Sequence, residues 1–250
     1  MKTKIESLIE KYELTHLQQE LMDTIFPCIK VVPKQKDKLE IGQSKMGGVP
    51  DVPVSFEYPT YKGEPLQFIA QFHVTDLKHI DFKHNLPQTG MLYFFRYENH
   101  FMEEGDFQGA GRVLYYDVSV DQLKRMEHMQ ERFTQCEISF ESTYKLPELF
   151  IEDEGDSDRF LQLLEELIPD HYDNHQVFGE PFSVQNDVLQ EAGEYIGVNR
   201  HDMVLLFQVD SDYNNCNMMW GDLGMLYFCI GNEDLKHRRF ENACCILQTC

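Results

Sequence analysis

The sequence is short of basic residues and has no cysteine pair with the spacing of a metal or redox motif. Lys and Arg number 22 against 43 Asp and Glu, which gives a formal net charge of −21. A field of this sign repels nucleic acids and anionic membranes, and it favours a basic partner. The seven cysteines are irregularly spaced, and no C-x-x-C occurs. We therefore expect reduced thiols in a cytoplasmic protein rather than a disulfide framework.

Other absences narrow the function further. No N-terminal apolar run is long enough for a signal peptide or a membrane span. A phosphate-binding loop needs a lysine after its last glycine and then a helix, whereas Lys45 precedes Gly47 and Gly48, and prolines follow. No pattern of a catalytic triad is present either. We therefore expect no nucleotide site and no cofactor.

What the sequence does contain is a pair of similar apolar runs. Gly-Met-Leu-Tyr-Phe occurs at 90–94 and again at 224–228, 134 residues later. A continuous apolar run rich in aromatics is typical of a strand that is buried on both faces. Three more similarities follow in the same order at nearby offsets: Gly48-Val49-Pro50 with Gly179-Glu180-Pro181, 67–72 with 204–209, and 113–117 with 244–248. The sequence therefore predicts an internal duplication.

These patterns predict an α+β protein that is mainly antiparallel β, with a roll-like sheet body built from the duplication and with peripheral helices. An apolar content of 42% is sufficient for a globular core. A capping box at Ser119 and Gln122 predicts a helix that continues to about Glu131. We expect a single domain over 1–250, with an N-terminal helical segment at 1–28, a first β-rich half at 39–145 and a second at 159–250.

Five stretches together carry a family resemblance: Ser44 to Pro50, 68–72, Leu86-Pro87-x-x-Gly90, 207–212 and 220–228. In combination they resemble the YwqG-like family, a bacterial domain family of unknown function. The resemblance covers the chain from about residue 30 to the C-terminus. It implies a mainly β, roll-like fold with peripheral helices, in a bacterial cytoplasm. It brings no established catalytic or cofactor residues to this sequence.

A calcium site is the first metal hypothesis, because Asp210, Asp212 and Asn214 begin like a calcium-binding loop. The pattern requires a glycine at its sixth position and a bidentate glutamate at its twelfth, but Asn215 and Gly221 stand there. We therefore do not expect calcium, and metal binding by these aspartates is the less favoured alternative.

A zinc site is the second metal hypothesis, because His171 and His175 have the spacing that places two ligands on one helix face. Pro169 precedes the pair, and no glutamate follows His171 as an H-E-x-x-H motif would require. An exposed loop is the favoured interpretation, with a metal site as the alternative.

The sharpest local feature is Trp220-Gly221-Asp222, which holds the only tryptophan and leads into the second apolar run. Trp220 would suit the wall of a binding site with Asp222 as a polar anchor, but packing at the turn is the favoured interpretation. Gln71 and Gln208 fall at matching places in buried strands, where we expect them to bind backbone groups, with a paired ligand site as the alternative. The candidate ligand- or partner-binding residues are Lys45, Gly47, Gly48, Gln71, Gln208, Trp220 and Asp222.

The function that these observations favour is that of a non-enzymatic protein- or ligand-binding module. Solubility alone is the favoured interpretation of the net charge. A basic protein partner, attracted by electrostatic steering, is the sub-case that the charge allows. The alternative is an enzyme or a small-ligand-binding protein. Its site would lie in a cleft between the two halves, near Lys45, Gly47, Gly48, Trp220 and Asp222.

Overall fold

A ten-stranded sheet forms the body of the protein in the computed structural model, which describes residues 2–78, 80, 85–97, 110–126, 131–147, 149–167 and 174–249. The strand order is β14-β13-β12-β11-β1-β10-β2-β6-β7-β8, and neighbouring strands are antiparallel. These strands are β1 (Phe26–Gln35), β2 (Lys45–Met46), β6 (Gln67–His73), β7 (Met91–Arg96), β8 (Gly111–Tyr116), β10 (Cys136–Lys145), β11 (Gln176–Val177), β12 (Met203–Asp210), β13 (Met225–Gly231) and β14 (Cys244–Gln248). The prediction of a mainly antiparallel β protein is therefore confirmed.

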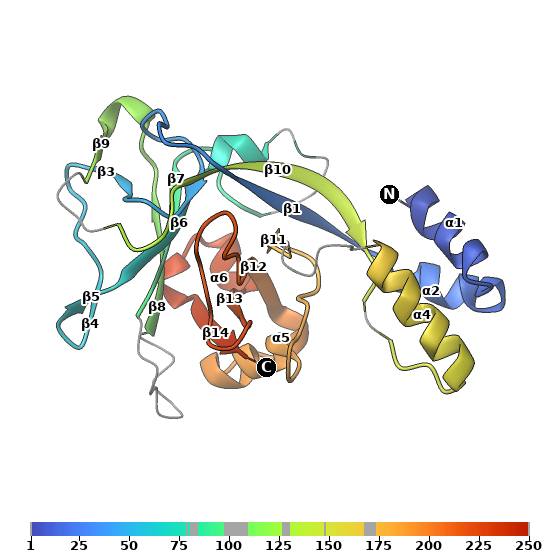
Figure 1. Cartoon of the computed structure of the whole chain (residues 1–250). Coiled ribbons are helices and arrows are strands. Elements are labelled where there is room, and N and C mark those ends of the chain that lie inside the picture. The colour runs from blue at the N-terminus through green and yellow to red at the C-terminus, as the bar shows by residue number, and fades with distance from the viewer. Residues whose placement is uncertain are drawn as a thin grey trace.

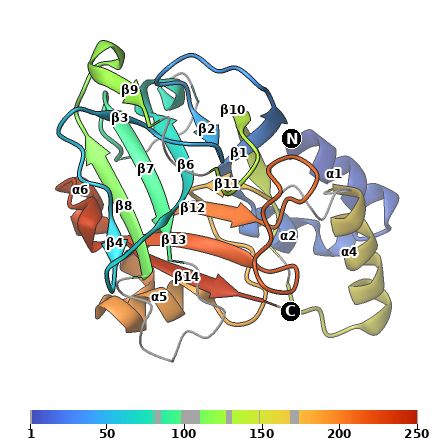
Figure 2. The ribbon, with the colours of Figure 1, turned by 60° about the vertical axis from the view of Figure 1, so that its left-hand side comes forward.

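The sheet has two sides around a central ribbon of β1 and β10, whose residues pair from Phe26 with Lys145 to Gln35 with Cys136. We call β2, β6, β7 and β8 the first-half strands, and β11, β12, β13 and β14 the second-half strands. The two sets follow the central ribbon outward in the same sequence order. Figure 2 shows that the sheet curls so that the first-half strands run across the second-half strands.

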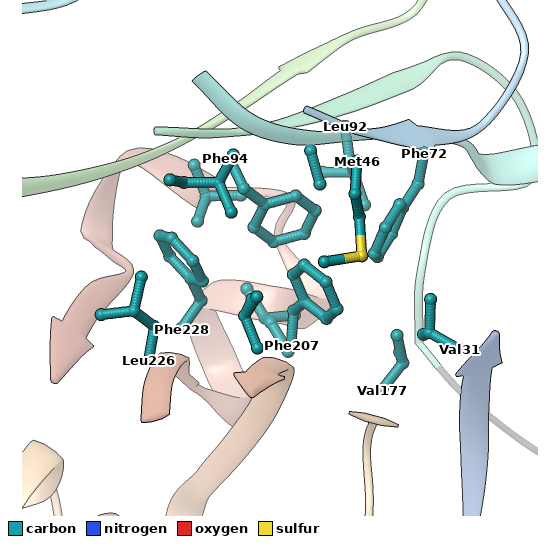
Figure 3. Close-up of a cluster of buried hydrophobic side chains, with 14 of the residues drawn as sticks. Val31, Met46, Phe72, Leu92, Phe94, Val177, Phe207, Leu226 and Phe228 are labelled. Carbon is teal, nitrogen blue, oxygen red and sulfur yellow. The ribbon is translucent and has the colours of Figure 1, made fainter. Parts of the chain in front are cut away.

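Phenylalanines fill the inside of this curled sheet. Phe72 on β6 lies 4.8 Å from Phe207 on β12 between ring centroids, and Phe94 on β7 lies 5.1 Å from Phe207 and 5.2 Å from Phe228 on β13 (Figure 3). Such pairs add to the stability that burial of their apolar area provides. The inner faces of the two halves therefore form one continuous core, in which Met46, Leu92 and Leu226 are also buried.

The two edges of the sheet approach each other without joining, so the sheet is nearly closed. A Cβ atom added to Gly111 on β8 would lie 2.2 Å from the Cβ of Cys245 on β14, which is closer than real Cβ contacts allow. Beside this contact the rings of Tyr115 and Phe240 lie 5.5 Å apart. Glycine at position 111 therefore permits the approach of the two edges.

The outer faces of the two halves are covered differently. On the first half, the cover includes β3 (Asp51–Pro53) paired with β9 (Leu123–Arg125), and the buried cluster there contains Val52, Phe68 and Tyr93. A further short pair joins β4 (Thr60–Tyr61) to β5 (Glu64–Pro65). On the second half, α5 (Val188–Ile196) covers Leu205, Tyr227 and Cys229, while α6 (Asn232–Lys236) follows β13. Both apolar runs are thus buried on both faces, as their sequences predicted.

Three helices make a separate cluster at one end of the central ribbon. These are α1 (Lys2–Lys11), α2 (Gln18–Thr24) and α4 (Glu154–Leu167), which lie away from the curled sheet in Figure 1. Their cluster includes Ile5, Leu8, Phe160 and Leu163. The expected N-terminal helical segment is present as α1 and α2, which pack together with α4, but β1 already begins at Phe26. None of the helices within the described ranges combines the length and the apolar character needed to cross a bilayer.

Candidate functional site

A buried ionic cluster lies under the outer cover of the first half. Lys45 on β2 and Asp51 on β3 have fully buried side chains, and Lys45 Nζ lies 3.2 Å from Asp51 Oδ2. Arg125 on β9 completes the cluster, because its Nε donates to Asp51 Oδ1 at 2.8 Å and its Nη2 donates to Oδ2 at 3.2 Å. The carboxylate of Asp51 therefore binds two cations that come from different strands.

Burial and the neighbouring charges shift the pKa values of Lys45 and Asp51. Burial lowers the pKa of Lys45 to about 8, and the neighbouring Asp51 opposes that shift. Burial alone would raise the pKa of Asp51, but the bonds from Arg125 and the charge of Lys45 hold it below its usual value. Lys45 Nζ is close to Asp51 but not aligned for a hydrogen bond with any described group. The pair is therefore an ionic contact in a poorly solvated place, where loss of either partner is costly.

The same cluster fixes the segment 40–43. The amide of residue 42 donates to Asp51 Oδ2 at 3.0 Å, Gln71 Nε2 donates to the carbonyl of residue 43 at 2.9 Å, and Arg125 Nη2 donates to the carbonyl of residue 40 at 3.4 Å. Three side chains from three strands thus hold a segment that has no regular secondary structure.

A hollow of about 260 Å³ is lined in part by this segment, and Asp51, Gln71 and Arg125 are not among its lining residues. Its wall is residues 41–44, and its other sides come from β6, the turn after it, and β10. Ile41 and Val120 stand exposed at its edge, at 41% and 39%. The complete lining is Ile41, Gly42, Gln43, Ser44, His73, Asp76, Val120, Glu137 and Ile138.

The polar groups of the hollow are oriented by one another. The hydroxyl of Ser44 donates to Asp76 Oδ2 at 2.6 Å, and its oxygen accepts from the backbone amide of His73 at 2.8 Å. His73 Nδ1 lies 3.6 Å from Asp76 Oδ1, and Glu137 accepts from Lys36 at 2.8 Å. Because Ser44 points its proton at Asp76 rather than at the imidazole, this is not the arrangement of a serine nucleophile with a histidine base.

The corresponding place on the second half has different chemistry. His175, next to β11, accepts at Nδ1 from the amide of Asp210 at 3.1 Å, and its Nε2 lies 3.4 Å from Asp212 Oδ2. Burial raises the pKa of Asp210 to about 6, although its carboxylate accepts from the amide of Asn174. Burial would also raise the pKa of Asp212, but bonds from His175 and Asn215 bring it below its usual value.

This arrangement corrects the expectation of an exposed loop at His175, whose side chain is fully buried with both ring nitrogens engaged. His171 lies outside the described residues. Asp212 directs its carboxylate to the backbone and side-chain amides of Asn215. Within the described ranges, no three His, Cys, Asp or Glu side chains gather as a metal ion would require.

The two glutamines bind backbone, as the favoured interpretation predicted. Gln71 Oε1 accepts from the amide of Asp51 at 2.7 Å, and Gln208 Oε1 accepts from the amide of Phe182 at 2.9 Å. Each Nε2 donates to a backbone carbonyl, that of residue 43 for Gln71 and that of residue 174 for Gln208. Both side chains are fully buried. Their amides are therefore used inside the fold, and the geometry does not favour a paired ligand site.

A tyrosine completes each of these contacts. Tyr93 on β7 donates to the carbonyl of Asp51, and Tyr227 on β13 donates to the carbonyl of Phe182, both at 2.6 Å. In each half, a glutamine and a tyrosine thus bind the N–H and the C=O of one residue. We call this arrangement the backbone clamp. It consists of Gln71 and Tyr93 on Asp51 in the first half, and of Gln208 and Tyr227 on Phe182 in the second.

Trp220 is a packing residue, as the favoured interpretation predicted. It is only 5% exposed, its Nε1 donates to the carbonyl of Asp210 at 3.1 Å, and its ring lies 5.4 Å from that of Phe133. Asp222 lies exposed in the turn that follows. Trp220 therefore lines the core, and it does not form a binding wall together with Asp222.

Gly47 and Gly48 lie where two chain segments touch. Both have positive φ, at 66° and 65°. A Cβ atom on Gly47 would lie 2.2 Å from the carbonyl oxygen of Thr134, and the amide of Gly48 donates to the carbonyl of Phe133. Phe133 thus connects the glycines to Trp220, but the contact is packed rather than open.

The hollow lies on the first half, and phenylalanines fill the space between the halves where the alternative hypothesis placed a cleft.

Several residues of the site were missed by sequence reasoning. Asp51 and Arg125 are 74 residues apart and meet only because β3 pairs with β9. His73, Asp76 and Glu137 line the hollow but belong to no motif. One signal was available for Asp51, because the similar stretches Gly48-Val49-Pro50 and Gly179-Glu180-Pro181 are followed by Asp51 and by an apolar Phe182, respectively.

Fold and site together define a nearly closed antiparallel sheet domain, in which one half holds the buried Lys45, Asp51 and Arg125 cluster and the other holds the buried contact of His175 with Asp212. The family model described as a domain of unknown function (DUF1963) matches residues 44–250, and the chain belongs to this family. The matched part includes the whole ionic cluster and excludes α1, α2 and β1. No curated protein is significantly similar to the chain.

Proposed function

We propose that the protein is a non-enzymatic binding module that recognises a basic protein. The supporting observation is the position of its charge. Of the acidic side chains that the structure describes, only Asp51, Asp156, Asp210 and Asp212 are buried. Most of the acidic side chains in the described ranges therefore lie at least partly exposed, where they attract a cationic partner over distances of about a Debye length.

The test is to capture partners from the host lysate at low and moderate salt and then to measure binding with the purified components. We expect a basic protein whose association rate and affinity both fall as salt rises. Variants in which several exposed acids become amides should bind it more weakly. The proposal fails if no basic protein is retained, or if the affinity of the purified pair is independent of salt.

A second candidate function is small-ligand binding or catalysis, and Lys45 is the observation that favours it. A lysine with a lowered pKa is a feature of functional sites as well as of buried ion pairs. A thermal-shift screen with sugars, acyl compounds, nucleotides and metals would test this function. A stabilisation by one ligand class that Ser44→Ala abolishes would favour it over partner binding.

We also propose the internal duplication, with the first half at 39–145 and the second at 159–250. It is supported by the backbone clamp in both halves and by the matching strand order. An irregular register interrupts β6 against β7 between Phe68 and Ala70, and β12 against β13 between Leu205 and Phe207. These two interruptions are again 137 residues apart.

The assignment to the YwqG-like family and to a bacterial cytoplasm belongs to the same proposal. The described cysteines, at 28, 136, 216, 229, 244 and 245, are free and buried, in keeping with a reducing compartment. Fractionation of the host with compartment markers would test the location.

A further inference from the structure

We infer that the hollow beside the 40–43 segment is the place where one cationic side chain of the partner, an arginine or a lysine, is bound. This inference rests on the proposed function and adds the position and chemistry of the contact. Arginine and lysine side chains share an apolar stem and a charged end. The hollow offers surfaces for both parts.

The edge of the hollow suits the stem. Ile41 and Val120 are large apolar side chains that are 41% and 39% exposed, and both line the hollow. Ile138 continues this apolar lining inward and is only 6% exposed. A chain of methylene groups laid across these residues would remove apolar surface from water on both partners.

The polar side of the hollow suits the charged end. Asp76 has a side chain that is 43% exposed and is oriented by the hydroxyl of Ser44. Glu137 is 35% exposed and binds Lys36, whose own side chain is 45% exposed. Because exposed ion pairs contribute little to stability, a cation from the partner can replace Lys36 at small cost.

The buried cluster behind the wall does not oppose a cation in the hollow. Lys45 and Arg125 carry two positive charges there, and Asp51 carries one negative charge. Glu131 adds a second negative charge, which also acts on Lys45. The cluster is thus close to neutral, whereas the hollow has two carboxylates, that of Asp76 beside His73 and that of Glu137 beside Lys36. An anionic ligand would meet these two carboxylates and is disfavoured.

The wall of the hollow is already ordered before binding. Asp51, Gln71 and Arg125 hold the backbone of residues 40–43 from behind. A site whose walls are fixed in advance loses less entropy when a ligand is bound.

The test uses the full chain with N-acetylarginine amide and N-acetyllysine amide as cationic probes, and with N-acetylcitrulline amide as a neutral probe of similar shape. Binding is followed by NMR chemical shifts and by calorimetry. We expect both cationic probes to shift resonances of Ser44, His73 and Asp76, and the citrulline probe to cause no shift there. Absence of shifts at these residues with either cation would overturn the inference.

Matched variants separate a local site from the general field. Asp76→Asn and Asp222→Asn remove the same charge from an exposed position, but only Asp76 lines the hollow. We expect Asp76→Asn to weaken binding of the cationic probes by about fivefold or more and Asp222→Asn to leave it within about twofold. Ile41→Ser, which keeps every charge, should also weaken binding. Equal effects of the two Asp variants would show a diffuse field and overturn the inference.

The proposed function and the site can fail independently. If the basic partner binds the wild type and Asp76→Asn equally well, the function stands and the hollow is not the contact. If the cationic probes bind in the hollow but no basic protein is found, the site stands and the proposed function falls.

Discussion

The two halves of the sheet hold one residue in the same way but surround it with different chemistry. In the first half the clamped residue is Asp51, which binds Lys45 and Arg125. In the second half the clamped residue is Phe182, whose side chain is 44% exposed. The glutamine and the tyrosine of the clamp are present in both.

The strand next to the clamp also carries a charged residue in the first half and a neutral one in the second. Lys45 on β2 pairs with Gln71, whereas a neutral Gln176 on β11 pairs with Gln208. Because the clamped residue of the second half, Phe182, carries no charge, an ion pair at the clamped residue is not a requirement of this backbone geometry. Buried ion pairs are also poor sources of net stability. The charges of the first half are better explained by what they support, which is the wall of the hollow.

The largest expected effect is that of Asp51→Asn. This change leaves Lys45 and Arg125 without their carboxylate, and we expect it to lower the free energy of unfolding by about 3–5 kcal/mol at pH 7. Phe182→Leu is the matched change on the second half, and its half-exposed position should limit the loss to about 1 kcal/mol. Urea unfolding followed by circular dichroism measures both.

The pH dependence of this difference sharpens the comparison. The pKa of Lys45 is lowered to about 8 in the folded protein, so the folded state holds fewer protons than the unfolded state above that pH. Raising the pH therefore relieves the cost of an unpaired Lys45. Asp51→Asn removes the charge that opposes this lowering, so Lys45 loses its proton at a lower pH in the variant than in wild type, and the deficit of Asp51→Asn should shrink as the pH rises to about 8. If Asp51→Asn lost no more free energy of unfolding than Phe182→Leu at pH 7, the distinction between the halves would be contradicted.

The second prediction concerns the glutamines, where the halves should behave alike. Gln71→Leu and Gln208→Leu each leave one backbone amide and one backbone carbonyl without a partner in the interior. At about 1–2 kcal/mol for each group, the lower part of the range for an unsatisfied buried group, we expect each variant to lose about 2–4 kcal/mol. Gln71 also donates to Asp51 Oδ2 at 3.0 Å, so its loss should be the larger. Thermal and urea unfolding give the two values, and a harmless Gln208→Leu would show that the clamps are not equivalent.

The third prediction isolates the buried acid of the second half. Burial raises the pKa of Asp210 from 3.8 to about 6, so the folded state binds its proton more tightly than the unfolded state. The stability that this proton contributes is present below about pH 4 and is lost as the pH rises to about 6. Asp210→Asn does not undergo that loss. The free energy of unfolding of the variant minus that of wild type should therefore be about 2 kcal/mol larger at pH 7 than at pH 4. Urea midpoints at both values measure this, and a constant difference would contradict it.

Local patterns were sufficient for part of this structure. The apolar runs predicted strands buried on both faces, and the matched glutamines predicted buried amides that bind backbone. The capping box of Ser119 and Gln122 forms as predicted. The expected helix does not follow, because the chain turns into β9 at Leu123 to pair with β3. That pairing joins residues 70 or more positions apart, and local propensity carries no information about it.

The site was harder to predict for the same reason. The hollow requires segments around Ser44, Asp76, Val120 and Glu137 to meet, which depends on how β10 lies against β2. The residue types at these positions are ordinary surface types. Trp220, by contrast, was assigned correctly to packing, because a tryptophan at a turn is usually a buried anchor whose N–H binds backbone.

The smallest expected effects are those of the clamp tyrosines, and they test the likeness of the halves most directly. Tyr93 and Tyr227 are fully buried, and each donates to a carbonyl at 2.6 Å. Tyr93→Phe and Tyr227→Phe remove one hydroxyl and leave the ring in place, so we expect each to cost about 1 kcal/mol. The ionic cluster should not alter this cost, since the hydroxyl of Tyr93 binds the backbone of Asp51 and not its carboxylate. Asp51→Asn combined with Tyr93→Phe should therefore be additive in unfolding measurements. An interaction energy above about 0.5 kcal/mol would show that clamp and charges act as one unit.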